Sequence, residues 1–259
     1  MKFLLVSDQI DPFVYSTNIK DRYGDVDAVF CAGDLPLAYV DFIVTSLNKP
    51  VYFIYGNHDL KGYSYYSKKG NKDPFDQSAF HDRFDFACGG DYASNRVLRN
   101  KKLTWKFKNG KESPLLVAGV SGSRRYNAGE CQFTEKQMFF QLLRLLPSLI
   151  INKIRYGRYC DVFLAHASPR HIHDKEDACH KGFECFNWFI KKFSPALFIH
   201  GHIHLYDLQS ERVTKTEKTT VVNAFSRILV ELNAIEKEGD KKSKKGGNLE
   251  FSVSVFPNG

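Results

Sequence analysis

Short apolar runs, each closed by polar residues, recur through the first 60 residues of the chain. The runs at 2–6, 28–31 and 51–55 are rich in β-branched and aromatic residues, which is typical of buried parallel strands. A helix is expected over about 36–47, because Pro36 is tolerated in a first helical turn. Strand, loop and helix therefore alternate, as in an α/β fold.

The pattern changes at about 61–92, where Tyr, Lys, Gly and Asp crowd together. We interpret this region as an insertion or cap beside the active face, with a short helix near 76–84. Antiparallel strands are expected afterwards, with Asn109-Gly110 as a hairpin turn. These strands are predicted at 95–98, 103–107 and 115–120.

A long helix is predicted at about 134–150, with Thr134 and Gln137 forming a capping box and Pro147 kinking or ending the helix. A strand at 161–165 and a helix near 183–193 follow. Further strands are expected near 196–200, 203–208, 219–224, 227–233 and 250–256. Together these elements predict two β-sheets packed face to face with helices outside, as a single domain over 1–259.

The composition, with 43% hydrophobic and 25% charged residues, is that of an ordinary soluble globular protein. No apolar run approaches the roughly 18–20 residues that cross a bilayer, so no membrane association and a cytoplasmic location are expected. The net charge of +8 fits an anionic substrate or nucleic acid without deciding between them. Part of this charge lies in the Lys-rich run at 241–245, which we interpret as a solvated loop.

The six cysteines form no CxxC pair and no dense framework. Free thiols are therefore expected, as in a reducing compartment. A loop disulfide between Cys179 and Cys185 is the alternative that their short separation allows.

Residues that can bind metal follow five of the expected strands. They occur as Ser7-Asp8, Gly33-Asp34, GNHD at 56–59, His166, and HGHIH at 200–204. Strand ends hold side chains on a rigid support, so the pattern indicates a metal site. The alternative for any single motif is a structural histidine or an ordinary turn.

A two-metal centre needs a bridging carboxylate and further ligands for each ion. Imidazole, carboxylate and amide oxygen together suit Mn, Fe or Zn. His58 could protonate a leaving oxygen or stabilise charge on phosphorus. The candidate metal ligands are Asp8, Asp34, Asn57, His166, His202 and His204.

The order SDxxD, GD, GNHD, AH and GHIH resembles the calcineurin-like metallophosphoesterase superfamily, from Asp8 to His204. The resemblance implies a four-layer α/β/β/α sandwich of two mixed β-sheets flanked by helices. It also implies that Asp34 bridges two metal ions. Asn57, His166 and His202 would complete one site, Asp8 and His204 would serve the other, and His58 would be the catalytic residue.

One residue departs from the family pattern. The first motif is usually Asp-x-His, whereas this chain has Asp8-Gln9-Ile10, and isoleucine cannot bind a metal. Asp11 could replace the missing ligand directly or through water. A weak, hydrated or empty first site, a mononuclear enzyme, and an inactive protein are the other interpretations.

The segment Gly119–Tyr126 follows an apolar strand and resembles a segment that often faces the active site in related enzymes. Arg124 or Arg125 could bind phosphate there, and the alternative is a surface turn. His180 is expected to contact substrate from a loop over the metals. His171 and His173 could instead belong to a third metal site, and His81 is expected to be structural.

The sequence thus predicts a metal-dependent phosphohydrolase acting on a phosphate ester, with a small phosphodiester or nucleotide as the favoured substrate. The tyrosines and lysines at 63–69 could bind a nucleobase and a phosphate. The alternatives are a nuclease, a phosphomonoesterase or protein phosphatase, and a non-catalytic scaffold of the same fold. The sequence does not set the oligomeric state.

Overall fold

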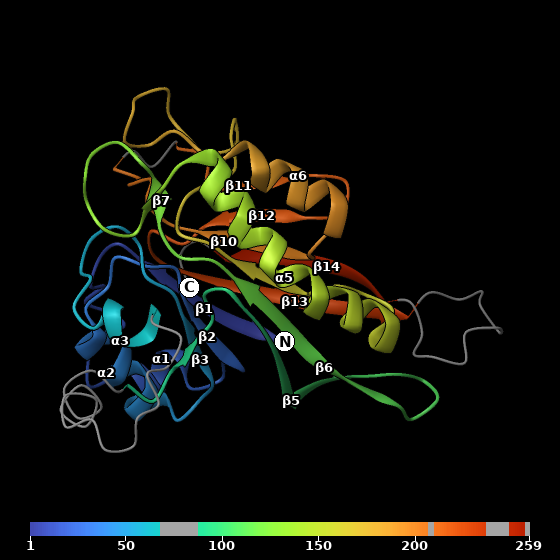
Figure 1. Ribbon diagram of the computed structural model, residues 1–259. Helices are drawn as coiled ribbons and strands as arrows, with labels where there is room; N and C mark the ends of the chain where they lie inside the picture. The colour runs from blue at the N-terminus through green and yellow to red at the C-terminus, as the bar shows by residue number, and fades with distance from the viewer. Residues whose placement is uncertain (68–87, 207–209, 237–248, 257–259) are drawn as a thin grey trace, which may run out of the picture.

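The computed structural model describes residues 1–67, 88–206, 210–236 and 249–256. Two six-stranded β-sheets form the centre of the molecule (Figure 1). The described residues include no helix that is both long and apolar enough to span a membrane.

The first sheet has the order β14-β13-β1-β2-β3-β4. Strands β1 to β4 run parallel, while β13 is antiparallel to both β1 and β14. The bounds are β1 Lys2–Ser7, β2 Ala28–Cys31, β3 Val51–Phe53, β4 Asp91–Tyr92, β13 Ser226–Glu236 and β14 Leu249–Phe256.

The second sheet has the order β11-β12-β10-β9-β6-β5. Its four inner strands are parallel, and β5 and β11 are antiparallel edge strands. The bounds are β5 Arg96–Lys106, β6 Glu112–Gly119, β9 Val162–Leu164, β10 Leu197–His200, β11 Val213–Lys215 and β12 Thr220–Asn223. A parallel ribbon of β7 Ser123–Arg124 and β8 Gln132–Phe133 stands apart.

The helices cover the outer faces of the two sheets. Helices α1 and α2 pack on the first sheet, and α5 and α6 pack on the second (Figure 1). Their bounds are α1 Ile19–Tyr23, α2 Leu37–Leu47, α3 Tyr63–Ser67, α5 Glu135–Tyr156 and α6 Glu184–Phe193. The predicted α/β/β/α sandwich of two mixed sheets is therefore confirmed.

Strand β1 shows why both faces of its sheet are apolar. Phe3 and Leu5 lie in the core between the sheets, whereas Leu4 and Val6 pack beneath the helices. Successive side chains of a strand point to opposite faces, so a strand buried on both sides is a continuous apolar run.

The sequence predicted that Pro147 would kink the long helix or end it near residue 150. The predicted end is wrong, because the helix continues beyond residue 150. Helix α5 begins with the predicted Thr134–Gln137 capping box but continues to Tyr156, and Gly157 caps it with a φ of 77°. Pro147 lies exposed, and Leu149 and Asn152 continue the buried face beyond it. Burial of that face offsets the hydrogen bond that proline cannot donate.

Two strand predictions also differ from the structure. The strands expected at 95–98 and 103–107 form one strand, β5, with an irregularity between Asn100 and Thr104. The strand expected at 203–208 is not formed over 203–206, where the backbone is irregular and carries His204. Strand β11 lies a few residues later, and its short polar sequence gave no apolar signal.

The predicted insertion at 61–92 falls partly outside the described residues, as do the helix near 76–84, His81 and the Lys-rich run. Within the described part, α3 follows GNHD and β4 joins the edge of the first sheet. All six cysteines are free, so the disulfide alternative for Cys179 and Cys185 is excluded.

Candidate metal centre

The predicted ligands lie at the carboxyl ends of parallel strands from both sheets. Asp8, Asp34 and Asn57 follow β1, β2 and β3 of the first sheet, while His166 and His202 follow β9 and β10 of the second. Ligands of open parallel sheets bind at these ends, where the loops converge. Packing the two sheets together therefore brings distant parts of the chain to one place.

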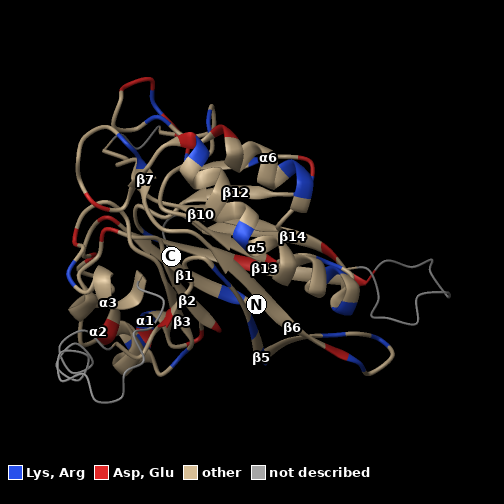
Figure 2. Cartoon of the chain, in the orientation of Figure 1, with Lys and Arg blue, Asp and Glu red and all other residues tan. Residues whose placement is uncertain are grey.

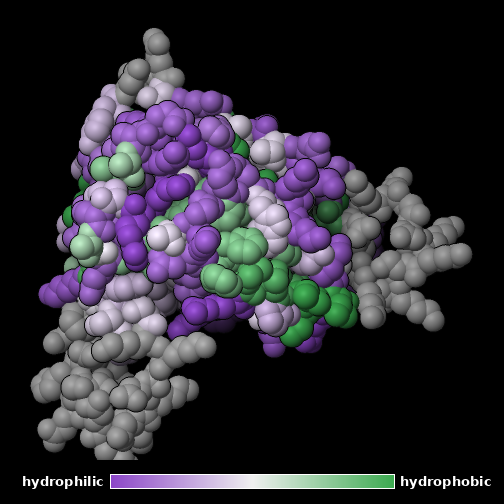
Figure 3. All heavy atoms as spheres, turned by 45° about the horizontal axis from the view of Figure 1, so that its top comes forward, coloured by the Kyte–Doolittle hydropathy of each residue, from purple (hydrophilic) through white to green (hydrophobic). Residues whose placement is uncertain are grey.

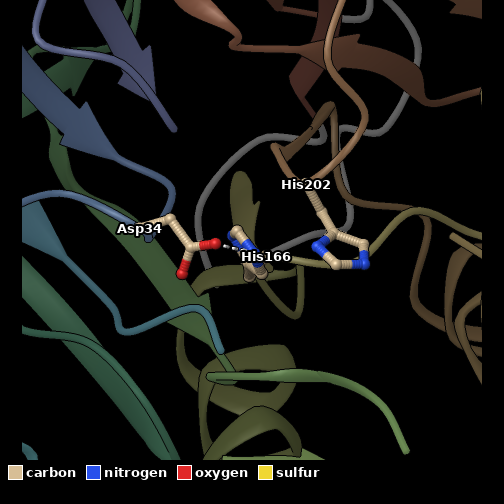
Figure 4. A group of neighbouring side chains, drawn as sticks. All are labelled: Asp34, His166 and His202. Atoms are coloured by element: carbon tan, nitrogen blue, oxygen red, sulfur yellow. Dashed lines mark ion pairs between the residues drawn. The ribbon is translucent and has the colours of Figure 1, made fainter. Parts of the chain in front are cut away.

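Asp34, His166 and His202 form a buried group that can hold a metal ion. One potential ligand atom from each lies within 4.8 Å of the others. His166 Nε2 is 3.2 Å from Asp34 Oδ2 (Figure 4). The set of one carboxylate and two imidazoles suits a borderline transition metal.

Backbone carbonyls orient both histidines of this group. The Nδ1 of His166 is 2.8 Å from the carbonyl of Ala32, and the Nε2 of His202 is 2.7 Å from the carbonyl of Cys179. A ring nitrogen that meets a carbonyl must carry the hydrogen, which leaves the other nitrogen free to bind metal. His166 thus offers Nε2 and His202 offers Nδ1.

The charges in the group are strongly coupled. Burial opposes a charge on His166, but the adjacent Asp34 carboxylate raises the pKa of His166 to about 9. Burial likewise opposes a charge on Asp34, but His166 holds the pKa of Asp34 well below its usual range. Burial and the charge of His166 lower the pKa of His202 to about 4. The pocket thus favours one positive charge beside Asp34.

The GNHD turn contributes three groups around Asp34. The backbone N–H of His58 donates to Asp34 Oδ1 at 2.7 Å, and this leaves Oδ2 facing His166. Asn57 is buried and donates from Nδ2 to the hydroxyl of Tyr126 at 3.2 Å. The side chain of His58 is exposed on the same turn.

Asp8 and His204 lie together beside the backbone of His202. Asp8 accepts the backbone N–H of His202 on both oxygens, at 3.0 and 2.9 Å. His204 Nε2 is 3.7 Å from Asp8 Oδ1, while its Nδ1 is 2.7 Å from the hydroxyl of Tyr206. Asp8 and His204 are the two residues that the resemblance assigns, with Asp34, to the first site.

Two buried polar atoms support the fit of a metal ion. Asn57 Oδ1 is buried without a hydrogen-bond partner, and His166 Nε2 is buried with only the Asp34 carboxylate beside it. Such atoms are costly unless a ligand satisfies them. Both belong to the ligand set that the sequence predicted for one site.

The backbone is strained at three of the ligand positions. Asp8, Asp34 and His202 have φ values of 65°, 53° and 67°. Non-glycine residues rarely adopt the left-handed region, and such residues cluster at functional sites. Each lies within three residues of the end of a strand, in the turn that leaves the sheet.

The sequence matches the family model for calcineurin-like phosphoesterases over residues 1–206. The chain belongs to the calcineurin-like phosphoesterase family. This membership makes it a phosphoric ester hydrolase, and Asp34, His166 and His202 are its candidate metal-binding group.

One solved structure shares the fold at low sequence identity, and two others align with lower scores. One crystal structure aligns with a TM-score of 0.55 at 12% identity, covering 88% of this chain and 93% of its own. Zinc-bound Vps29 from Entamoeba histolytica has a TM-score of 0.37 at 13% identity, over 98% and 99% of the two chains. An archaeal phosphodiesterase has a TM-score of 0.36 at 11% identity, over 99% and 100%. A comparison with curated protein sequences gives no match.

Asp11, which could have replaced the missing histidine of this phosphoesterase, has other partners. Its Oδ2 accepts from Arg227 at 2.7 Å and from Ser226 at 2.5 Å, and its Oδ1 accepts the backbone N–H of Phe13 at 2.8 Å. Burial opposes the charge, but these hydrogen bonds lower the pKa of Asp11. The structure thus ties Asp11 to strand β13, and Ile10 is 44% exposed.

The two candidate phosphate-binding arginines are engaged with the protein. Arg124 donates to Glu135 at 3.3 Å and to the carbonyl of Gly182 at 3.1 Å. Arg125 donates to the carbonyl of Gln132 at 3.4 Å. The next residue, Tyr126, is the one that contacts Asn57.

His180 lies beside His202, and its contact with substrate stays a prediction. Its ring centroid is 5.5 Å from that of His202, and its Nδ1 is 2.9 Å from Asp177. The neighbouring carbonyl of Cys179 orients His202. This loop therefore both covers the ligands and positions one of them.

His171 and His173 do not come together as a third site. His171 is exposed near Glu184, whereas His173 Nδ1 is 2.8 Å from the Nε2 of buried His200. Within the described ranges, the Asp34 group is the sole cluster of three or more acidic, histidine or cysteine ligands.

Sequence reasoning missed three contributors to the site. Tyr126 contacts Asn57, and the carbonyls of Ala32 and Cys179 fix the histidine tautomers. Tyr126 ends the segment that was singled out for its arginines, so its position was a usable signal. Backbone carbonyls carry no signal in the sequence.

Proposed function

We propose that this phosphoesterase is a phosphodiesterase with Asp34 between two metal positions. The observation that carries the proposal is the convergence of the Asp34 group with the Asp8–His204 pair around His202. Asn57, His166 and His202 would hold one ion with Asp34, and Asp8 and His204 would hold the other. The family pattern and the two buried ligand atoms support this assignment.

Bound metal would polarise a phosphoryl oxygen and lower the pKa of water. The protein then has to orient the ester and handle the leaving oxygen. His58 is exposed beside Asn57, and its backbone is held by Asp34. Its imidazole is the group we assign to proton donation to the departing oxygen.

We propose that the first site is the weaker of the two. Ile10 supplies no ligand, and the oxygens of Asp11 already accept from Phe13, Ser226 and Arg227. Asp8, Asp34 and His204 remain, which leaves more positions for water. Asp11 would then hold the loop after Asp8 rather than bind metal.

An aromatic surface beside the first site favours a diester with a planar group. Tyr206 is 83% exposed, and its ring centroid lies 5.6 Å from His204 and 5.9 Å from Phe225. An exposed tyrosine can stack a nucleobase or another aryl group. This placement supports a nucleotide-like phosphodiester as substrate.

The test combines metal analysis with substrate choice. We expect metal-loaded protein to hydrolyse bis(p-nitrophenyl) phosphate faster than p-nitrophenyl phosphate, with Mn, Fe or Zn bound. Tyr206→Ala should raise KM for nucleotide-like diesters, whereas Tyr206→Phe, which keeps the ring and removes only the hydroxyl beside His204, should leave KM near the wild-type value. Ile10→His should tighten the weaker metal site, while Asp11→Ala should leave metal affinity unchanged.

The alternatives give different results in the same assays. A nuclease, favoured by the net charge of +8, would cleave DNA or RNA with affinity falling steeply as salt rises. A phosphomonoesterase or protein phosphatase would prefer the monoester. Protein that retains no metal and hydrolyses neither ester with any added divalent ion would be a scaffold, and that outcome would refute the proposal.

A further inference from the structure

Helix α5 carries apolar side chains on two opposite faces. The inner face packs on the second sheet through Met138, Leu142, Leu145 and Leu149, all of which are buried. A surface helix normally presents polar residues on its other side. The outer face of α5 instead presents exposed apolar residues between its basic ones.

The outer face has apolar residues at alternating spacings of three and four. We call this set the outer seam, and it consists of Phe140, Leu143, Pro147, Ile150 and Ile154. Phe140, Ile150 and Ile154 are 61%, 50% and 60% exposed, and adjacent Ile151 is 52% exposed. The spacing is the a/d pattern with which one helix packs against another. At 1.5 Å per residue the seam is about 21 Å long.

The seam forms a continuous surface rather than scattered apolar residues. Figure 3 shows a hydrophobic band crossing this side of the molecule, in the region of α5. Single exposed apolar residues are normal in soluble proteins, whereas contiguous patches mark interaction sites. Four of the ten large hydrophobic residues that are exposed in the described ranges lie on this one helix.

The exposed charges of α5 itself have one sign. Lys136, Arg144, Lys153 and Arg155 are exposed on α5, whereas neighbouring α6 has both basic and acidic exposed residues (Figure 2). Glu135 is the one acidic residue of α5, and its carboxylate already accepts from Arg124 and from the backbone of Cys185. A ligand on this face therefore meets a positive rim.

We propose that the outer seam binds an amphipathic helix of another protein, with apolar a and d residues and acidic flanking residues. The a/d spacing of the seam fits a helical partner, and the basic residues beside the seam attract acidic side chains on that partner. A second copy of this chain would bring basic rims together, so charge disfavours self-association. The inference rests on α5 alone and is independent of the proposed function.

The probe is a synthetic helical peptide with Leu at a and d and Glu at e and g. Its control has Lys in place of Glu. We expect the full-length protein to bind the acidic peptide saturably, more weakly as salt rises, and to bind the basic peptide little. Heteronuclear NMR or fluorescence anisotropy would measure both titrations.

Two sets of variants locate the binding. The double variant Ile150→Ser with Ile154→Ser should lower the affinity for the acidic peptide about tenfold or more. Ile235 on β13 is similarly exposed, and Ile235→Ser should leave the affinity unchanged. Arg144→Glu with Arg155→Glu should reverse the preference between the two peptides. Circular dichroism and metal content should stay unchanged in all of them.

Three results would overturn the proposal. The first is failure to bind the acidic peptide, or equal binding by the Ile150/Ile154 variant. The second is a concentration-dependent dimer that the same variant abolishes, which would make the seam a contact between copies. The third is seam-dependent binding to phosphatidylserine vesicles without peptide binding, which would make it a membrane contact.

Discussion

His166 Nε2 lies 3.2 Å from Asp34 Oδ2, and the carbonyl of Ala32 fixes the ring by its contact with Nδ1. The two residues come from different sheets, so this contact joins the two halves of the sandwich at the candidate metal centre. It also couples their charges, raising the pKa of His166 and lowering that of Asp34.

Asp34→Asn should remove both metal retention and activity. The amide keeps the shape but loses the charge that a bridging ligand needs, and it leaves the charge of His166 uncompensated. Metal per chain, measured by plasma mass spectrometry, and diester turnover should fall together. Asp25→Asn makes the same chemical change at an exposed carboxylate paired with Lys2 and should alter neither.

His58→Gln should lower kcat by about 100- to 10,000-fold, the usual contribution of a general acid. Metal content should stay near normal, because the imidazole is exposed and is not in the buried ligand group. The loss of kcat should be smaller for esters whose leaving groups depart without being protonated. His171→Gln, at an exposed histidine elsewhere, is the control; equal losses with good and poor leaving groups would contradict proton donation.

Gly56→Ala should disrupt the metal centre. A Cβ at this position would overlap Asp34 Oδ1 and lie 2.6 Å from His166 Cε1, so the ligands would have to move apart. We expect lost metal binding and a free energy of unfolding reduced by about 1–3 kcal/mol. Gly110 has a φ of 77°, and a Cβ added there would meet no other atom. Gly110→Ala should therefore cost only about 1–2 kcal/mol of backbone strain. Its metal content should match that of the wild type.

His173 should make stability depend on pH. Burial between His200 and Thr214 lowers the pKa of His173 to about 4, although Glu211 opposes the shift. The unfolded chain, with a pKa near 6.5, then binds more protons between about pH 4 and 6.5. This contribution to stability is present above about pH 6.5 and is lost as pH falls toward 4.

His173→Gln should reduce that dependence in chelated protein, as measured by urea unfolding at several pH values, while buried His200 and His202 retain their share of it. His171→Gln should retain it, because His171 is exposed. If the free energy of unfolding of the His173 variant changes with pH as steeply as that of the wild type, other groups cause the dependence.

Much of the fold could be predicted because local sequence decides it. A strand such as β1 is buried on both faces and is therefore apolar throughout, and the Thr134–Gln137 capping box marks the start of α5. The course of α5 past Pro147 was not predictable in this way. The packing of Leu149 and Asn152 against the rest of the protein offsets the break, and that contact is not local.

The partners of Asp11 show the same limit at the site. Its ion pair joins residues 216 positions apart, so no spacing rule connects Asp11 with Arg227. The sequence showed a carboxylate beside a missing ligand and left its role open. The structure shows three donors around it.

By itself, the sequence determined the strand-end motifs, the family and the identity of the candidate ligands, since each motif is a short contiguous stretch whose chemistry depends on its own residues. Tertiary structure decided which atoms of these ligands are free, because the carbonyls of Ala32 and Cys179 reach His166 and His202 from other segments. Hydrogen bonds of this kind depend on how the two sheets pack, and every residue type has a carbonyl, so side-chain identity could not reveal them.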